Sequence, residues 1–119
     1  MSAGFFLLLA AALVAAGVVA SSGIADTSQG ERSGEQVVQY QCVLCHGPGL
    51  SGAPRIGDAR AWNQRARVGL DGLVSSATRG RGAMPPSGGL SDLSEPELRS
   101  AIAYMLRRSG VDTATPKQL

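Results

Sequence analysis

The chain opens with a long apolar segment and continues as a polar, glycine-rich sequence. Residues 3–20 (AGFFLLLAAALVAAGVVA) contain only apolar residues and glycine, and no charged side chain precedes residue 26. A run of this length is about the minimum that spans a bilayer as a helix, and it exceeds the usual core of a signal peptide. Small residues up to Ala20 and Ala25 match a cleavage-site pattern, whereas a basic n-region is missing. Residues 1–25 are therefore expected to be an uncleaved membrane anchor or a cleaved export signal, and either one exports the rest.

Beyond a polar linker at residues 26–32, apolar spacing and capping signals predict helices. Ser33 with Gln36 forms a capping-box pattern, so a first helix should begin there, continue through residues 42–46 and end at the breaker sequence at 47–49. Asp58 is a suitable N-cap for a second helix that reaches about Arg67. Asp71 is expected to start a third, shorter helix that ends at Gly80. The proline- and glycine-rich residues 81–93 predict a loop.

The last predicted helix carries the clearest signals. Ser94 and Glu97 form a second capping box, and Gly110 is the expected residue just past the C-terminus. Its apolar positions recur at helical spacing and predict one buried face: Leu98, Ala101, Ile102, Met105 and Leu106. Neither a strand pattern nor a repeat is evident. The sequence thus predicts an all-α domain of three to four short helices at residues 33–110, followed by a tail at 111–119.

Composition indicates that this domain needs a staple. Only 17 of the 94 residues after Ala25 are Leu, Ile, Val or Phe, whereas 13 are glycine. That apolar share is close to the level below which chains struggle to build a core. The net charge is only +2, which does not fit a strongly charged disordered tail. The sequence TRGRG at residues 78–82 occurs once, without repeats or interleaved aromatic residues, and so does not indicate nucleic-acid binding. A small domain of this kind is expected to fold around disulfides, a metal or a large cofactor.

The sequence QYQCVLCHGPG at residues 39–49 holds both cysteines of the chain, Cys42 and Cys45, and its only histidine, His46. A structural zinc site would need a second ligand pair, which the chain lacks. A thioredoxin-type thiol pair belongs at a strand–helix junction, and a disulfide over this short loop would constrain little. The pattern C-x-x-C-H is the signature of c-type haem attachment and accounts for all three residues. It predicts thioether bonds from both cysteines and an axial iron ligand in His46.

A sixth iron ligand is then expected from Met84. The chain has one histidine, so bis-histidine ligation within it is impossible. Met84 lies in a loop, GAMPPSGG, where no apolar periodicity gives it a place in the core, and two prolines stiffen the backbone that follows. Met105, on the apolar face of the last helix, is expected to fill the core instead. Ligation by methionine and histidine raises the reduction potential and suits electron transfer.

With these motifs the domain resembles a bacterial class I c-type cytochrome, most similar to the cytochrome c-five subgroup, over residues 33–108. The resemblance rests on CVLCHGPGLSGAPRIGD, AWNQR, GAMPPSGGLSD and ELRSAIAYML. It implies a class I cytochrome c fold in which the first and last helices cross and the rest wraps one covalent haem c. It also implies that the Pro54 carbonyl holds the proximal imidazole. Trp62 is expected to wall the core, or less often to bond a haem propionate.

Two departures from the subgroup stand out, namely a missing second cysteine pair and a longer join, LSDLSEPEL, into the last helix.

The function expected is one-electron transfer between redox protein partners on the periplasmic side of a bacterial inner membrane. The domain would be anchored there by the N-terminal helix, or soluble in the periplasm if that segment is cleaved. Alternatives are a dedicated haem c subunit of a larger membrane complex and, less favoured, a haem enzyme or gas sensor with an open iron site. No enzyme activity is expected of a carrier, and arginines such as Arg55, Arg79 and Arg81 are surface residues by default.

Overall fold

A computed structural model of the chain describes residue 17 and residues 30–113. Apart from Gly17, the predicted anchor or signal at 1–25 lies outside the described residues, as do linker residues 26–29 and tail residues 114–119. The described chain is helical, and its only strand-like feature is an isolated bridge between Arg81 and Met84. In this part of the chain no helix has the length and apolar character needed to cross a membrane.

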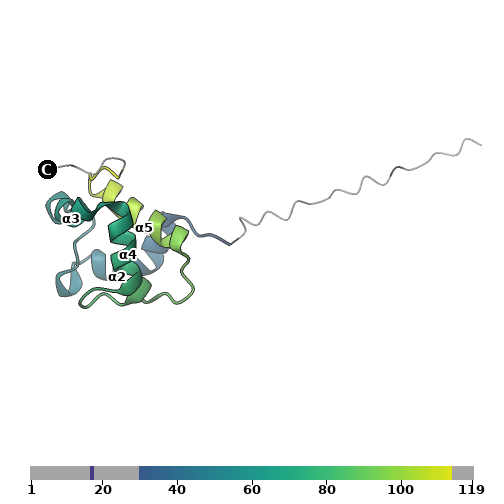
Figure 1. Cartoon of the computed structure of the whole chain (residues 1–119), viewed down its shortest axis with the longest axis horizontal. Coiled ribbons are helices and arrows are strands. Elements are labelled where there is room, and N and C mark those ends of the chain that lie inside the picture. The colour runs from purple at the N-terminus through teal and green to yellow at the C-terminus, as the bar shows by residue number, and fades with distance from the viewer. Residues whose placement is uncertain (1–16, 18–29, 114–119) are drawn as a thin grey trace, which may run out of the picture.

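The described chain forms a series of short helices that pack together (Figure 1). The first is continuous over residues 34–46, which we call the attachment helix because it carries the C-x-x-C-H motif. It consists of α1 (Gly34–Val37), a π-helical turn η1 (Val38–Cys42) and α2 (Val43–His46). The other elements, in chain order, are η2 (Leu50–Gly52), α3 (Ala59–Arg65), η3 (Ala66–Val68), α4 (Gly69–Arg79), η4 (Pro86–Gly89) and α5 (Glu95–Arg108).

The predicted helix starts are confirmed at three of four positions. Ser33 and Ser94 each form a complete capping box, with Gln36 and Glu97 respectively. Asp58 accepts a hydrogen bond from the Ala61 N–H at the start of α3. The third helix, α4, begins at Gly69, two residues before the predicted Asp71, and no side chain caps its start. Asp71 bonds Arg99 of α5 instead, at 2.7 Å.

The C-terminal end of α5 is closed by a Schellman motif, in which the left-handed residue is Gly110 (φ +72°) as predicted. The Gly110 N–H bonds the Arg107 carbonyl, and the Val111 N–H bonds the Leu106 carbonyl at 2.9 Å. Val111 and Leu106 are both buried, which supplies the apolar contact that accompanies this motif. The chain reverses at Gly110 and returns Val111 to the core, just past the predicted end of the domain at residue 110.

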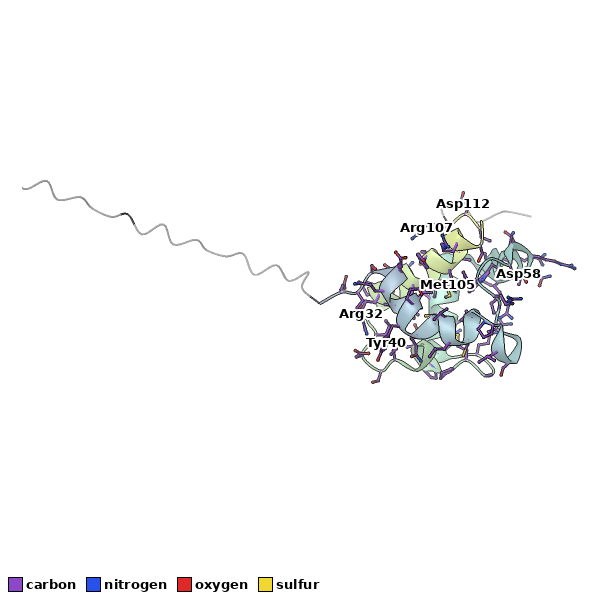
Figure 2. The ribbon with its side chains drawn as sticks, turned by 180° about the vertical axis from the view of Figure 1, so that it is seen from behind. Arg32, Tyr40, Asp58, Met105, Arg107 and Asp112 are labelled. Atoms are coloured by element: carbon purple, nitrogen blue, oxygen red, sulfur yellow. The ribbon has the colours of Figure 1, made fainter. Side chains whose placement is uncertain are left out.

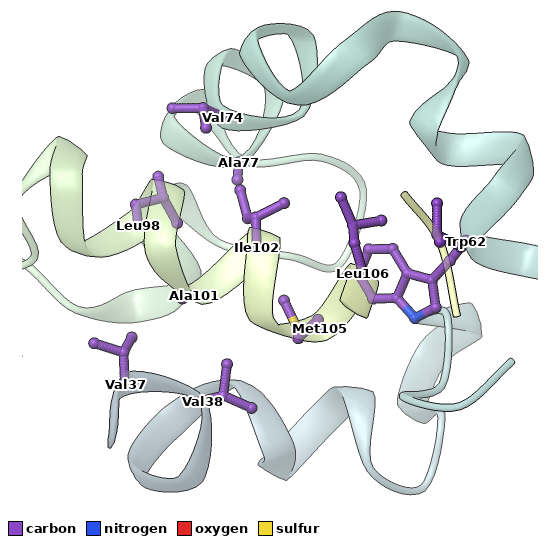
Figure 3. Close-up of a cluster of buried hydrophobic side chains, with 11 residues drawn as sticks. Val37, Val38, Trp62, Val74, Ala77, Leu98, Ala101, Ile102, Met105 and Leu106 are labelled. Atoms are coloured by element: carbon purple, nitrogen blue, oxygen red, sulfur yellow. The ribbon is translucent and has the colours of Figure 1, made fainter. Parts of the chain in front are cut away.

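The core forms where α5 lies between the attachment helix and α4 (Figure 3). Gly34 allows the close approach of α1, since a Cβ at this position would lie 2.1 Å from the Ser100 carbonyl oxygen of α5. The predicted apolar face of α5 is buried, and Met105, at 3% exposure, fills the core as expected. The buried set is completed by residues from the other helices and from the C-terminal reversal: Val37, Val38, Trp62, Val74, Ala77 and Val111.

Arg32, the last residue of the predicted linker, bonds to α5. Its guanidinium bonds both carboxylate oxygens of Glu97, and its backbone N–H bonds Glu97 Oε1 at 2.8 Å. Glu97 is buried, at 3% exposure. Figure 2 shows Arg32 and Asp58 at opposite ends of the domain. The contact fixes the chain where it enters the attachment helix, at the N-terminal end of α5.

Candidate haem site

Cys42, Cys45 and His46 lie on successive turns of the attachment helix. Their spacing of three and four residues puts them on one side of it. Both thiols are free, Cys42 is partly buried against the core cluster and Cys45 is exposed. Leu44, between them, is 59% exposed. The motif thus meets the core on one side and solvent on the other.

The His46 imidazole is buried and held by the loop that follows the helix. Its Nδ1 atom lies 2.8 Å from the Pro54 carbonyl oxygen, so Nδ1 carries the proton in this contact. The backbone supports the same geometry, because the Ile56 N–H bonds the His46 carbonyl at 2.8 Å. Nδ1 is engaged by the Pro54 carbonyl, so Nε2 is the ring nitrogen left available to bind a metal ion. The contact implied for Pro54 is therefore present.

Trp62 of α3 forms the wall beside this imidazole. The two rings stack with centroids 5.4 Å apart and planes inclined by 28°, and Trp62 is only 4% exposed. In Figure 3 the indole lies next to Leu106 of α5. Its N–H donates to the Arg55 carbonyl at 2.9 Å. Because an indole has only this donor, the arrangement leaves none for a haem propionate, and Trp62 acts through its ring.

Met84 lies in the segment 80–90, which we call the Met84 loop. Two backbone hydrogen bonds between Arg81 and Met84, both 2.9 Å, close a tight turn that presents this methionine. Gly80 (φ +81°) packs so closely that a Cβ there would lie 2.8 Å from the Met84 carbonyl oxygen and 2.8 Å from the Pro86 nitrogen. The Met84 side chain is partly buried and packs against the same core cluster as Cys42. The loop is thus folded on itself, and the Met84 side chain contacts the edge of the core but stays partly exposed.

One contact in this region was not foreseen from the sequence. The Gln41 side-chain amide, on the residue before the first cysteine, donates to the Gly88 carbonyl at 2.9 Å. Gln41 gives no motif signal, because glutamine on a helix is ordinarily a solvated residue. The π-helical turn that carries it was equally unforeseen, since its apolar spacing reads as an ordinary helix.

Other chemistries find no support in the described residues. No group of three or more His, Cys, Asp or Glu side chains could hold a metal ion there. Burial raises the pKa of the Cys42 thiol above its ordinary value.

The residues present fit a covalently attached haem. Two free thiols lie on one helical face, and an imidazole beside them keeps Nε2 available. A thioether borders the same core from a preformed loop. Thioether and imidazole are iron ligands, and cysteine thiols at this spacing are the attachment groups of haem c.

Comparison with known proteins agrees with this chemistry. Residues 29–105 match the family described as cytochrome C oxidase, cbb3-type, subunit III. A cytochrome c5 of Azotobacter vinelandii is 49% identical over 64% of this chain and 94% of that protein. A cytochrome c5 of Ectopseudomonas mendocina is 46% identical over 68% and 95%. A chain in the crystal structure of an electron transfer complex of nitrite reductase with cytochrome c is 41% identical, with a TM-score of 0.61 over 64% of this chain and 93% of that one.

The fold and the site therefore define a class I c-type cytochrome, and the chain belongs to that family. It carries a single covalently bound haem c and is an electron carrier. Within the class it is c5-like, by its similarity to the two cytochromes c5.

Proposed function

We propose that the domain transfers one electron at a time through a haem c with histidine and methionine as axial ligands. Cys42 and Cys45 form the thioether bonds, His46 Nε2 is the proximal ligand and the Met84 sulfur is the distal ligand. The observation that supports this most directly is the 2.8 Å contact from His46 Nδ1 to the Pro54 carbonyl, beside two free thiols. The haem supplies the redox chemistry, and the protein supplies ligation and burial.

The chain's own residues suit transfer without a change of ligands. The Pro54 carbonyl fixes the imidazole plane, and Trp62 stacks against it. On the other side, the turn at residues 81–84 fixes Met84. Fixed ligands keep the structural change on electron transfer small. Cys45 and Leu44 are exposed, so an electron has a short exit to a partner at the attachment motif.

We further propose that the domain works on the periplasmic side of a bacterial inner membrane, tethered by residues 1–25 or released if they are cleaved. The support is the uncharged apolar run at residues 3–20 and the need of haem c for an exported chain. Its partners are redox proteins; the cytochrome c in the similar solved complex pairs with nitrite reductase. Intact mass of the purified protein tests tethering and attachment together, since it reports both cleavage and haem addition.

A second candidate is a haem c subunit of a larger membrane complex, favoured by the description of the matching family as an oxidase subunit III. Extraction in mild detergent separates the two. A lone, tethered monomer supports the carrier, whereas a stable assembly of fixed stoichiometry supports the subunit.

The ligand assignment is tested with Met84→Ala in the haem-loaded protein. The variant should lose the methionine–iron charge-transfer band of the ferric state, bind carbon monoxide readily in the ferrous state and have a lower reduction potential. Met105→Leu is the matched control, because that sulfur is buried in the core, and it should keep the band. A Met84→Ala protein with an unchanged spectrum would refute distal ligation. Ready carbon monoxide binding by the unaltered protein would favour a sensor or enzyme.

A further inference from the structure

The Met84 loop contains a run of left-handed backbone that something must hold in place. Ser87, Gly88 and Gly89 have φ values of +52°, +63° and +89°. Ser87 is one of only two non-glycine residues with positive φ in the described chain. This conformation costs an L-residue roughly 1–2 kcal/mol. The internal bonds of the run, Gly88 N–H to Pro85 and Leu90 N–H to Ser87, are 3.0 and 3.2 Å long.

The attachment helix reaches this run through one side chain. The Gln41 amide donates to the Gly88 carbonyl at 2.9 Å, and a Cβ at Gly89 would lie 3.4 Å from its nitrogen. Among the described residues it makes the only side-chain hydrogen bond between the attachment helix and the Met84 loop. Gln41 is partly buried, so water competes weakly for the carbonyl.

The π-helical turn accounts for the position of Gln41. A π-helical turn holds one residue more than an α-helical turn, so it rotates the residues that follow relative to the buried Val37 and Val38. Gln41 lies in this turn, immediately before Cys42. The turn thereby places a partly buried amide next to the attachment cysteine, whereas Gln39 in the same turn is exposed and makes no side-chain hydrogen bond.

We infer that Gln41 is a positioning residue for the distal ligand: its bond to Gly88 ties the Met84 loop to the helix that carries the haem and keeps the Met84 sulfur at the iron. The inference rests on the proposed ligation by Met84. The ferric state depends on it most, because a thioether is a soft ligand that binds ferric iron less well than ferrous iron. Without the tie, the loop has more conformations away from the iron, and the effective concentration of the sulfur falls.

Competition with an added ligand measures this effect in the full-length, haem-loaded protein. Imidazole binds ferric iron only when Met84 leaves, so its apparent affinity rises by the factor by which Met84 ligation weakens. Gln41→Leu keeps the size and helix propensity of the side chain and removes the donor. A hydrogen bond of ordinary net strength predicts an imidazole affinity about two- to tenfold higher than in the unaltered protein. Gln39→Leu, in the same turn, should leave it unchanged.

A second readout follows the loop without reference to ligand binding. Amide hydrogen exchange at Gly88 and Leu90 should accelerate in Gln41→Leu, while exchange in the middle of α5 stays the same. Equal imidazole affinities for Gln41→Leu and Gln39→Leu would overturn the inference, even where Met84→Ala opens the iron. If Met84→Ala itself changes neither the affinity nor the charge-transfer band, the ligand assignment fails first, and the role of Gln41 fails with it.

Discussion

At the scale of single residues, Glu97 shows how one buried carboxylate joins separate parts of the chain. Its oxygens accept from the Ser94 N–H at the start of α5 and from the backbone and guanidinium of Arg32. Asp92 lies 3.5 Å from the same guanidinium. The side-chain bond from Arg32, followed by the two backbone bonds, lowers the pKa of Glu97 from 4.5 to about 2.

This lowered pKa predicts that the protein loses folding stability over a defined range of acid pH. A carboxyl group with a lowered folded-state pKa contributes stability that is complete above its unfolded value, here 4.5, and is lost as the pH falls through about 2. Glu97→Gln should be less stable than the unaltered protein at pH 7, and the difference should shrink between pH 4.5 and 2. Urea unfolding followed by far-UV circular dichroism measures this. Glu95→Gln changes an exposed neighbour and is the control. If the free energy of unfolding of both variants depended on pH in the same way, Glu97 would not be the source of this loss of stability.

For the candidate site, the sequence proposes the chemical groups, whereas most of the contacts that support them gave no sequence signal. Cys42, Cys45, His46 and Met84 are proposed from residue type and spacing, because few side chains can bind iron or form thioethers. The groups that hold these side chains in place are mainly backbone carbonyls, such as the Arg55 carbonyl that accepts from the Trp62 indole. Every residue has a backbone carbonyl, so residue type does not reveal which one is used. Gln41 is a side chain, yet its role depends on a π-helical turn that differs from an α-helix by one residue.

At the scale of elements, Gly34 sets the distance at which α1 crosses α5. Its position against the Ser100 carbonyl leaves no space for a side chain, and the neighbouring atoms are backbone, which cannot rotate away. The buried Val37 and Val38 then pack directly against α5 (Figure 3). A crossing of this kind needs glycine at one point and apolar residues one turn later.

Gly34→Ala should therefore destabilise the protein by about 2 kcal/mol or more, since the helices must separate. The sign is informative, because alanine in place of glycine inside a helix otherwise stabilises by up to about 1 kcal/mol. Urea unfolding of the haem-loaded protein gives the change. Gly30→Ala, where a Cβ meets nothing within 4 Å, should be near neutral. If the two variants were equally stable, the close approach would not hold the helices together.

The ends of the helices could be predicted from the sequence where a nearby side chain or glycine caps the backbone. Both serine capping boxes, the Asp58 cap and the glycine at the end of α5 are decided within a few residues, and all were predicted. The start of α4 was misplaced because no side chain caps it, so the sequence carries no local signal for its first residue. The contacts of Arg32 and Val111 carried no local signal, because their partners, Glu97 and Leu106, are distant in sequence or depend on the chain reversal after α5.

At the scale of the whole molecule, the core is small and made of modest side chains. The largest fully buried ones are Leu106, Val37 and Val38, and Trp62 is the only aromatic residue in the buried cluster. No disulfide adds to it, since both cysteines are free thiols. A domain of this size usually needs a covalent or metal staple. A covalently bound haem c is the large apolar group that can complete the core, and we propose that the attachment helix holds it.

A variant that cannot form either thioether bond should therefore lose its folded structure as well as the haem. We expect a Cys42→Ser/Cys45→Ser protein, purified without haem, to show little far-UV helical signal and no cooperative urea transition. Cys42→Ser alone keeps one attachment point at Cys45 and should stay folded with haem, at lower stability, which separates loss of the staple from any effect of serine. A sigmoidal unfolding curve for the haem-free double variant would show that the apolar cluster suffices. Its absence would mean that the motif CVLCH supplies both the redox centre and the missing part of the core.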